Sequence, residues 1–216
     1  MQSKTCNFQL SLFYQHNINE NTRLGIWRIE EDENFFLQYV PLQREITHPH
    51  KRLQHLAGRF LLKQLFPDFP HREILIADTR KPYLPYEQYH FSLSHCGTYA
   101  AAIVSKTERV GIDIEIPSAK IEKISHKFLN DPERNFLASL TDYSSAEVLT
   151  VMWSAKEAVY KWWGWGSVDF SNHILLQPFN DAEDINAFFL RAEEKFSLNL
   201  KYKIFEQLCL VWVASF

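Results

Sequence analysis

The sequence predicts an α+β protein that is built from antiparallel sheets. Expected strands and helices are mixed along the chain, and many of the strands follow one another through short turns. Each half of the chain also holds a group of strands and one long helix. A doubly wound parallel sheet would instead alternate strands with crossover helices. We therefore expect two α+β halves that meet near residues 106–109.

The elements expected in the first half follow from apolar periodicity and from turn residues. A helix is predicted over residues 45–65, because its apolar side chains recur at the helical period until Pro67. Two strands should flank the turn at residues 96–98. The other elements expected here are strands at 7–15, 22–30 and 73–77 and a helix at 30–40.

The second half opens with a strand at 110–116, which Pro117 closes. A helical stretch at 123–140 is broken near Asp131, where Asp131 can cap the second helix and Pro132 can occupy its first position. A long helix is predicted over 146–163, ended by Gly164. The last expected elements are strands at 173–179, 187–194, 198–206 and 208–216.

Composition sets the broad class of the protein. The 216 residues are 46% hydrophobic and 15% aromatic, which is ample for a packed core, and a net charge of −3 favours neither nucleic acid nor an anionic membrane as a partner. Three widely separated cysteines predict neither a disulfide framework nor a zinc knuckle. With no signal peptide and no span of about 20 apolar residues, we expect a cytoplasmic protein.

The stretch Gly-Ile-Asp-Ile-Glu at 111–115 raises a chemical question. Alternation along a strand places Val110, Ile112, Ile114 and Ile116 on one face and puts two carboxylates, Asp113 and Glu115, on the other. Like charges about 6–7 Å apart repel each other, and a hard divalent cation such as Mg²⁺ would relieve that repulsion. The simpler interpretation is a solvated strand face.

Further candidates lie on the long second helix and at a turn. Glu157 and Lys161 share one helix face, either as a stabilising surface pair or as a third carboxylate and a phosphate contact. Tryptophans at 153, 162, 163 and 165 surround them, as core packing or as a partner-facing surface. Ser94 and His95 end a strand and could donate to an anion, although a lone histidine is more often structural. The basic residues that could serve the same anion are Arg52, Arg59, Arg80 and Lys81.

Together these stretches resemble the 4′-phosphopantetheinyl transferase superfamily, in its longer, surfactin-synthetase-activating type. The matching blocks occur in family order and span roughly residues 50–165. They are AGRFLL (57–62), KPYL (81–84), FSLSH (91–95), GIDIE (111–115) and WSAKEAVYK (153–161).

The resemblance implies a fold and a reaction. It implies two similar subdomains related by a pseudo-twofold axis, which we place at 1–108 and 109–216, with coenzyme A between them. Such enzymes use Mg²⁺ to move the 4′-phosphopantetheine arm of coenzyme A onto a serine of an apo acyl or peptidyl carrier protein. The other product is adenosine 3′,5′-bisphosphate. It also implies a monomer.

The resemblance also assigns roles by position. It makes Asp113, Glu115 and Glu157 the metal ligands, with Glu157 and Lys161 as catalytic residues. It assigns coenzyme A binding to Lys81, Ser94, His95 and Lys161, and Arg52 lies where a basic residue often contacts the 3′-phosphate. Arg59 fits coenzyme A binding and helix packing equally well, and Arg80 could itself reach the nucleotide. Arg80 stands where the family pattern has glycine, so the loop backbone is open to question there. Two other functions stay open: an inactive carrier-protein or coenzyme A binding module, and another metal-dependent phosphotransferase or phosphodiesterase.

Overall fold

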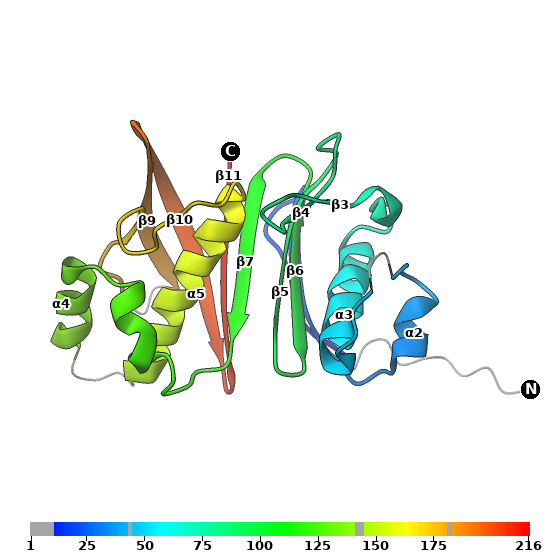
Figure 1. Ribbon diagram of the computed structural model, residues 1–216, viewed down its shortest axis with the longest axis horizontal. Helices are drawn as coiled ribbons and strands as arrows, with labels where there is room; N and C mark the ends of the chain where they lie inside the picture. The colour runs from blue at the N-terminus through cyan, green and yellow to red at the C-terminus, as the bar shows by residue number, and fades with distance from the viewer. Residues whose placement is uncertain (1–10, 43–44, 141–144, 181–182) are drawn as a thin grey trace, which may run out of the picture.

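The computed structural model describes residues 11–42, 45–140, 145–180 and 183–216. It is an α+β protein in which two antiparallel sheets stand side by side at the centre and the long helices α3 and α5 flank them (Figure 1). The fold class predicted from the sequence is confirmed. None of the described helices is long and apolar enough to cross a membrane.

The first sheet has the strand order β1-β2-β6-β5, and all of its strands come from the N-terminal half. Their bounds are Leu12–Asn17 for β1, Thr22–Arg28 for β2, His90–Cys96 for β5 and Tyr99–Ser105 for β6. Helices α2 (Glu33–Leu37) and α3 (Pro49–Leu65) pack beside it, and β3 (Leu75–Ile76) pairs separately with β4 (Pro82–Tyr83).

The second sheet has the order β7-β11-β10-β9-β8 and is built from the C-terminal half. Its strands are β7 (Arg109–Glu115), β8 (Ile174–Leu176), β9 (Asp184–Arg191), β10 (Glu194–Phe205) and β11 (Leu208–Ser215). The helical elements are the 3₁₀ helix η2 (Glu122–Lys127), α4 (Asp131–Ser139) and α5 (Ser145–Trp163). The sheet membership agrees with a division at residue 108, and the two subdomains themselves stay a prediction.

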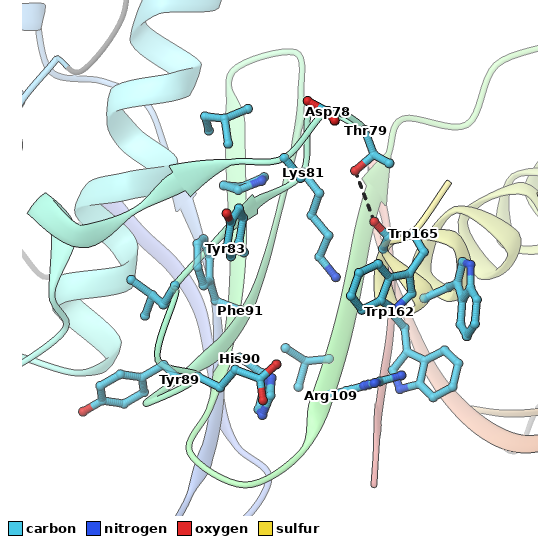
Figure 2. Close-up of a pocket in the computed structure, with 18 residues that line it drawn as sticks. Asp78, Thr79, Lys81, Tyr83, Tyr89, His90, Phe91, Arg109, Trp162 and Trp165 are labelled. Atoms are coloured by element: carbon cyan, nitrogen blue, oxygen red, sulfur yellow. Dashed lines mark hydrogen bonds between the residues drawn. The ribbon is translucent and has the colours of Figure 1, made fainter. Parts of the chain in front are cut away.

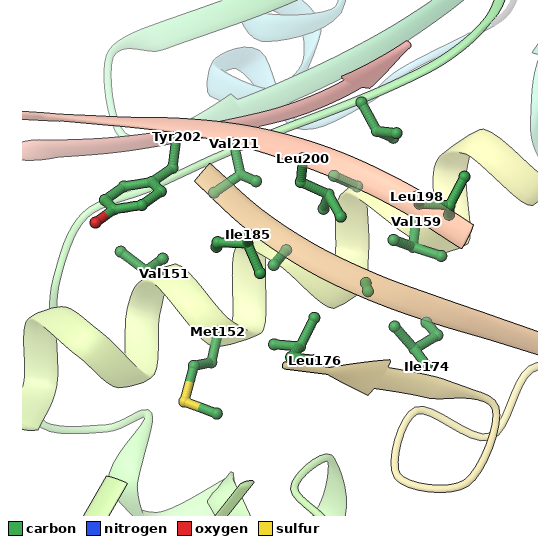
Figure 3. Close-up of a cluster of buried hydrophobic side chains, with 14 of the residues drawn as sticks. Val151, Met152, Val159, Ile174, Leu176, Ile185, Leu198, Leu200, Tyr202 and Val211 are labelled. Atoms are coloured by element: carbon green, nitrogen blue, oxygen red, sulfur yellow. The ribbon is translucent and has the colours of Figure 1, made fainter. Parts of the chain in front are cut away.

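Three apolar clusters hold these layers together. One lies between α3 and the first sheet, and another packs around α5 and the second sheet, where Val159 lies near Leu198 (Figure 3). The third lies between the sheets and joins Leu24 and Ile26 of β2 to Ile112 of β7. Burial of this apolar surface is the main term that stabilises the assembly of the two sheets.

Several expected boundaries need correction. α3 begins at Pro49 rather than near residue 45, because the ring of His48 accepts the amide of Lys51 and caps the helix. The cap of α4 is Asn130, which forms a reciprocal capping box with Glu133, and not Asp131. The expected strand at 73–77 shrinks to two residues. Residues 7–10 of the first expected strand lie outside the described residues.

The face assignment in β7 is correct inside the strand and wrong at its end. Val110, Ile112 and Ile114 are buried between the sheets, whereas Ile116 follows the last strand residue and is 42% exposed. Asp113 is buried on the opposite face, toward α5. Gly164 ends α5 as expected, in the left-handed conformation with φ of +79°.

Candidate active site at the junction of the two sheets

A glycine allows α5 to lie directly on β7. A Cβ atom added at Gly111 would lie 2.0 Å from the carbonyl oxygen of Ala158 and 2.8 Å from the amide nitrogen of Trp162. No larger residue fits at this position without moving the helix. This close approach holds the carboxylate face of β7 against the side chains of α5.

Serine side chains join the two sheets along β5 and β7. The hydroxyl of Ser92 accepts the amide of Ile112 at 3.2 Å, and the hydroxyl of Ser94 accepts the amide of Ile114 at 3.3 Å. These two strands belong to different sheets, and the bonds advance in the same direction along both of them. We call this pair of bonds the serine seam. It replaces a backbone ladder at the place where the halves of the chain meet.

At the serine seam, three predicted residues form one hydrogen-bonded cluster. Lys161 donates to Asp113 Oδ1 at 2.6 Å and to Ser94 Oγ at 3.0 Å, and Ser94 Oγ lies 2.8 Å from the same carboxylate oxygen. Asp113 is 3% exposed, and within the described chain its Oδ2 atom has no hydrogen-bond partner. A buried carboxylate oxygen without a donor is costly unless a ligand completes it.

The other two predicted carboxylates are coupled to this cluster. Burial raises the pKa of Glu115, the charge of Asp113 adds to the rise, and Cys96 donates a hydrogen bond to Glu115 at 3.4 Å. Burial raises the pKa of Glu157 to about 7; Lys161 opposes this, and Asp113 and Glu115 add to it. The three acidic groups therefore repel one another across a shared, partly dehydrated space.

This arrangement fits a hard divalent cation in its chemistry. No three His, Cys, Asp or Glu side chains in the described ranges form a ready-made metal cluster. However, Mg²⁺ keeps several of its waters, so protein ligands can act at longer range than in an all-protein cage. The unpaired Oδ2 of Asp113 and the two carboxylates with raised pKa values are the groups that a cation would stabilise.

Two hydrogen bonds connect the loop before β4 to the end of α5. Lys81 donates to the backbone carbonyl of Lys161 at 2.6 Å, and Thr79 donates to the carbonyl of Gly164 at 3.2 Å. Burial lowers the pKa of Lys81 to about 8, with a further contribution from Arg109. A cavity of about 220 Å³ lies between this loop and α5, and Lys161 lines it with Arg80 and Ser92.

Arg80 keeps the backbone conformation that glycine favours. Its φ angle is +66°, and its side chain is exposed beside the smaller cavity. The replacement of glycine by arginine therefore leaves the left-handed turn intact and places a cation at its surface.

The remaining predicted binding residues lie less centrally. His95 is largely exposed next to Ser94; partial desolvation lowers its pKa, and the charge of Lys161 contributes. Arg52 forms an ion pair with Glu33 of α2. Arg59 is buried within α3, where it lies 3.1 Å from the ring of His55. These contacts of Arg52 and Arg59 serve the packing of α2 and α3 and do not connect them to Asp113.

Sequence reasoning missed a buried ion pair next to the site. Lys156 is fully buried and donates to Glu133 at 2.7 Å and to the carbonyls of Phe170 and Ile174 at 2.8 and 2.7 Å. Glu133 also accepts the amides of Asn130 and Leu176. The only signal in the sequence is a lysine on the apolar side of the helix, directly before Glu157. This network fixes α4 and the start of β8 against α5.

Core packing is confirmed for two of the four tryptophans, and a partner-facing role for the exposed Trp165 stays a prediction. Trp162 is buried, and Trp162 and Trp163 both contact the rings of Phe189 and Phe196. Trp165 lies beyond the helix and is 69% exposed. Core packing explains the first two, and the third is a surface residue.

The C-terminal half of the chain is similar to a known protein family. Residues 109–212, which contain the three carboxylates and Lys161, match the model of the 4′-phosphopantetheinyl transferase superfamily. This match covers just under half of the chain and agrees with the resemblance that the sequence motifs indicate. The longer, surfactin-synthetase-activating type stays a prediction.

Several curated proteins are also similar to this chain. Enterobactin synthase component D of Salmonella typhimurium is 34% identical over 137 residues, which cover 62% of this chain and 54% of that protein. The Escherichia coli K12 protein of the same name is 30% identical, covering 58% and 62%. The 4′-phosphopantetheinyl transferase AcpT of that strain is 29% identical, covering 62% and 72%. The chain thus spans little more than half the length of the first of these relatives.

Proposed function

We propose that this protein transfers the 4′-phosphopantetheine arm of coenzyme A to a serine of an apo acyl or peptidyl carrier protein. The reaction is Mg²⁺-dependent and releases adenosine 3′,5′-bisphosphate. The observation that carries the proposal is the Lys161–Asp113–Ser94 cluster at the serine seam, with Glu115 and Glu157 coupled to it. Asp113 and Lys161 lie within the segment that matches the superfamily model, and Ser94 lies across the serine seam from that segment.

In the proposed reaction, the serine oxygen of the carrier attacks the phosphorus that bears the pantetheine arm. A new oxygen–phosphorus bond forms, and the bond from that phosphorus to the oxygen of the departing bisphosphate breaks. Asp113, Glu115 and Glu157 would hold Mg²⁺, which when bound neutralises charge on the diphosphate and polarises it.

Two side chains of α5 supply proton transfer and charge. Glu157 takes the serine proton, and a pKa raised to about 7 suits a general base near neutral pH. Lys161, which lines the 220 Å³ cavity and donates to Asp113, stabilises the negative charge of the departing bisphosphate. Ser94, on the other side of the serine seam, contacts both Lys161 and Asp113 and holds their side chains in place.

The test combines coenzyme A, Mg²⁺ and a panel of apo acyl and peptidyl carrier proteins. Intact-protein mass spectrometry should detect the added phosphopantetheine, and chromatography should detect adenosine 3′,5′-bisphosphate only when a carrier is present. Release of the bisphosphate without a carrier would favour a phosphodiesterase. Mg²⁺-independent binding of coenzyme A without any transfer would favour an inactive binding module.

Variants test the assigned residues. Asp113→Asn, Glu157→Gln and Lys161→Met should each slow transfer by about 100-fold or more, the usual size of a lost electrostatic or acid–base contribution. Glu147→Gln, on the same helix, and Lys63→Met, on α3, change exposed residues and serve as matched controls. Transfer at the parental rate by all three site variants would reject these roles.

A further inference from the structure

A second cavity, of about 560 Å³, adjoins the smaller one and shares Lys81, Phe91 and Gly164 with it. Figure 2 shows Lys81 entering it from the loop, with Tyr83, Tyr89 and Phe91 on one side and Trp162 and Trp165 on the other. Among the described residues that line it, none is a predicted metal ligand, and Lys161 does not reach it. Its volume is in the range of small-molecule sites.

Two cations face this space without a carboxylate partner. Lys81 and Arg109 approach it from opposite ends (Figure 2), and neither forms an ion pair within the described part of the chain. Arg109 lies close enough to depress the pKa of Lys81. Two like charges held around an apolar cavity repel each other, and an anionic group between them would relieve this repulsion.

The other titratable groups of the cavity do not form ion pairs with Lys81 or Arg109 in the described chain. Asp78 and Glu87 are exposed at its rim, and Asp78 sits at the outer end of the loop (Figure 2). Burial lowers the pKa of His90, Glu87 opposes this, and Arg109 and Lys81 lower it further, so this ring is neutral at neutral pH. The unpaired positive charge of the cavity is therefore that of Lys81 and Arg109.

The aromatic wall continues to the surface. Trp165 is 69% exposed and Tyr83 is 41% exposed at the mouth, whereas Trp162 is buried at the base. Large aromatic faces around a cavity bind flat apolar groups, and their exposure at its mouth marks a binding surface rather than core packing.

We propose that this cavity binds an organic anion with a flat apolar body, such as an aromatic carboxylate or sulfonate. The anionic group lies between Lys81 and Arg109, and the ring system lies against Trp162 and Trp165. Lys81 also donates to the carbonyl of Lys161, so its side chain connects the bound anion to the last turn of α5. Within the part of the chain that the structure describes, Asp113, Ser94 and Lys161 do not line this cavity, and Lys81 is the one member of the predicted coenzyme A set that does.

The probe for the test is 1-anilinonaphthalene-8-sulfonate, with N-phenyl-1-naphthylamine as its neutral counterpart. Fluorescence titration and calorimetry should show one sulfonate probe per chain, bound at least about fivefold more tightly than the neutral probe, the ratio expected for about 1 kcal/mol of charge-assisted contact. Saturating coenzyme A should leave the probe in place.

Variants at exposed positions locate the bound probe. Arg109→Gln and Trp165→Ala should each weaken binding by about fivefold or more. Lys120→Gln and Phe13→Ala remove an exposed cation and an exposed aromatic elsewhere and should leave the affinity within about twofold. Circular dichroism melting checks that each variant folds. Unchanged affinity in both cavity variants, or full displacement by coenzyme A, would overturn the proposal.

Discussion

Two lysines of α5 each pair with a carboxylate from another element, and the two pairs differ in how completely their polar atoms are satisfied. Lys156–Glu133 and Lys161–Asp113 have similar separations, 2.7 and 2.6 Å. The first is sealed from solvent, and its polar atoms are satisfied by backbone groups. The second keeps Lys161 24% exposed and leaves Asp113 Oδ2 without a partner in the described chain. A saturated pair stabilises a fold, whereas an incomplete one can accept a ligand.

The largest expected effect comes from breaking the sealed pair. Lys156→Met should lower the free energy of unfolding by about 3–5 kcal/mol, because it leaves the Glu133 carboxylate buried without its cation. Urea denaturation measures this, with the exposed Lys63→Met as control. The double variant Lys156→Met/Glu133→Gln should lose less than the sum of the single changes. A loss below about 1 kcal/mol in Lys156→Met would contradict the comparison.

The incomplete pair should respond in the opposite way. Asp113→Asn removes one of three mutually repelling carboxylates, so we expect stability to stay within about 1 kcal/mol of the parent or to rise. Transfer to a carrier should nevertheless fall by about 100-fold or more. Chemical denaturation and initial transfer rates, measured on one preparation, separate these effects. Equal losses of stability and activity would show that this pair is structural.

The buried His71 side chain should make the stability of the protein depend on pH. Burial lowers the pKa of His71 to about 4, with Lys63 and Arg59 contributing. The unfolded chain binds the proton near pH 6.5, so stability is complete above that pH and falls as pH drops toward 4. At pH 5 the loss is up to about 2 kcal/mol. His71→Phe should flatten this limb of the stability–pH curve, and an unchanged slope would contradict the assignment.

The smallest expected effect lies in the loop that brings Lys81 to α5. Arg80→Gly should raise the free energy of unfolding by about 0.5–1 kcal/mol, because φ of +66° strains every residue except glycine. The exposed Arg72 lies in the 3₁₀ helix η1 (His71–Glu73) and is not among the residues with positive φ, so Arg72→Gly should instead lower the free energy of unfolding. Thermal melting of both variants distinguishes backbone strain from a general effect of losing arginine.

Local patterns predicted much of this molecule. Alternation placed Asp113 and Ile112 on opposite faces of β7, and the glycine at 164 gave the end of α5. These features depend on neighbours in sequence, so one chain segment contains the necessary information. The start of α3 was misplaced because a histidine cap is an uncommon signal.

Features that depend on distant segments could not be predicted. Nothing near Ser92 or Ser94 indicates that their hydroxyls hold the amides of β7, because the partner lies 20 residues away. Likewise, Lys156 has no visible partner until the fold brings Glu133 beside it. Lys81 donates to a backbone carbonyl at the end of α5, and its orientation depends on a loop conformation that secondary-structure propensities do not predict. The roles assigned to the site residues stay predictions.

The serine seam has a mechanical consequence. The two sheets share no backbone ladder in the described chain, so the two serine hydroxyls, the side chains around Lys161 and the apolar cluster of Leu24, Ile26 and Ile112 hold them together. The relative position of the two sheets therefore depends on side-chain shape and not on a backbone register. A substitution that changes side-chain volume in this cluster would shift one sheet against the other and leave the strand pairing inside each sheet intact.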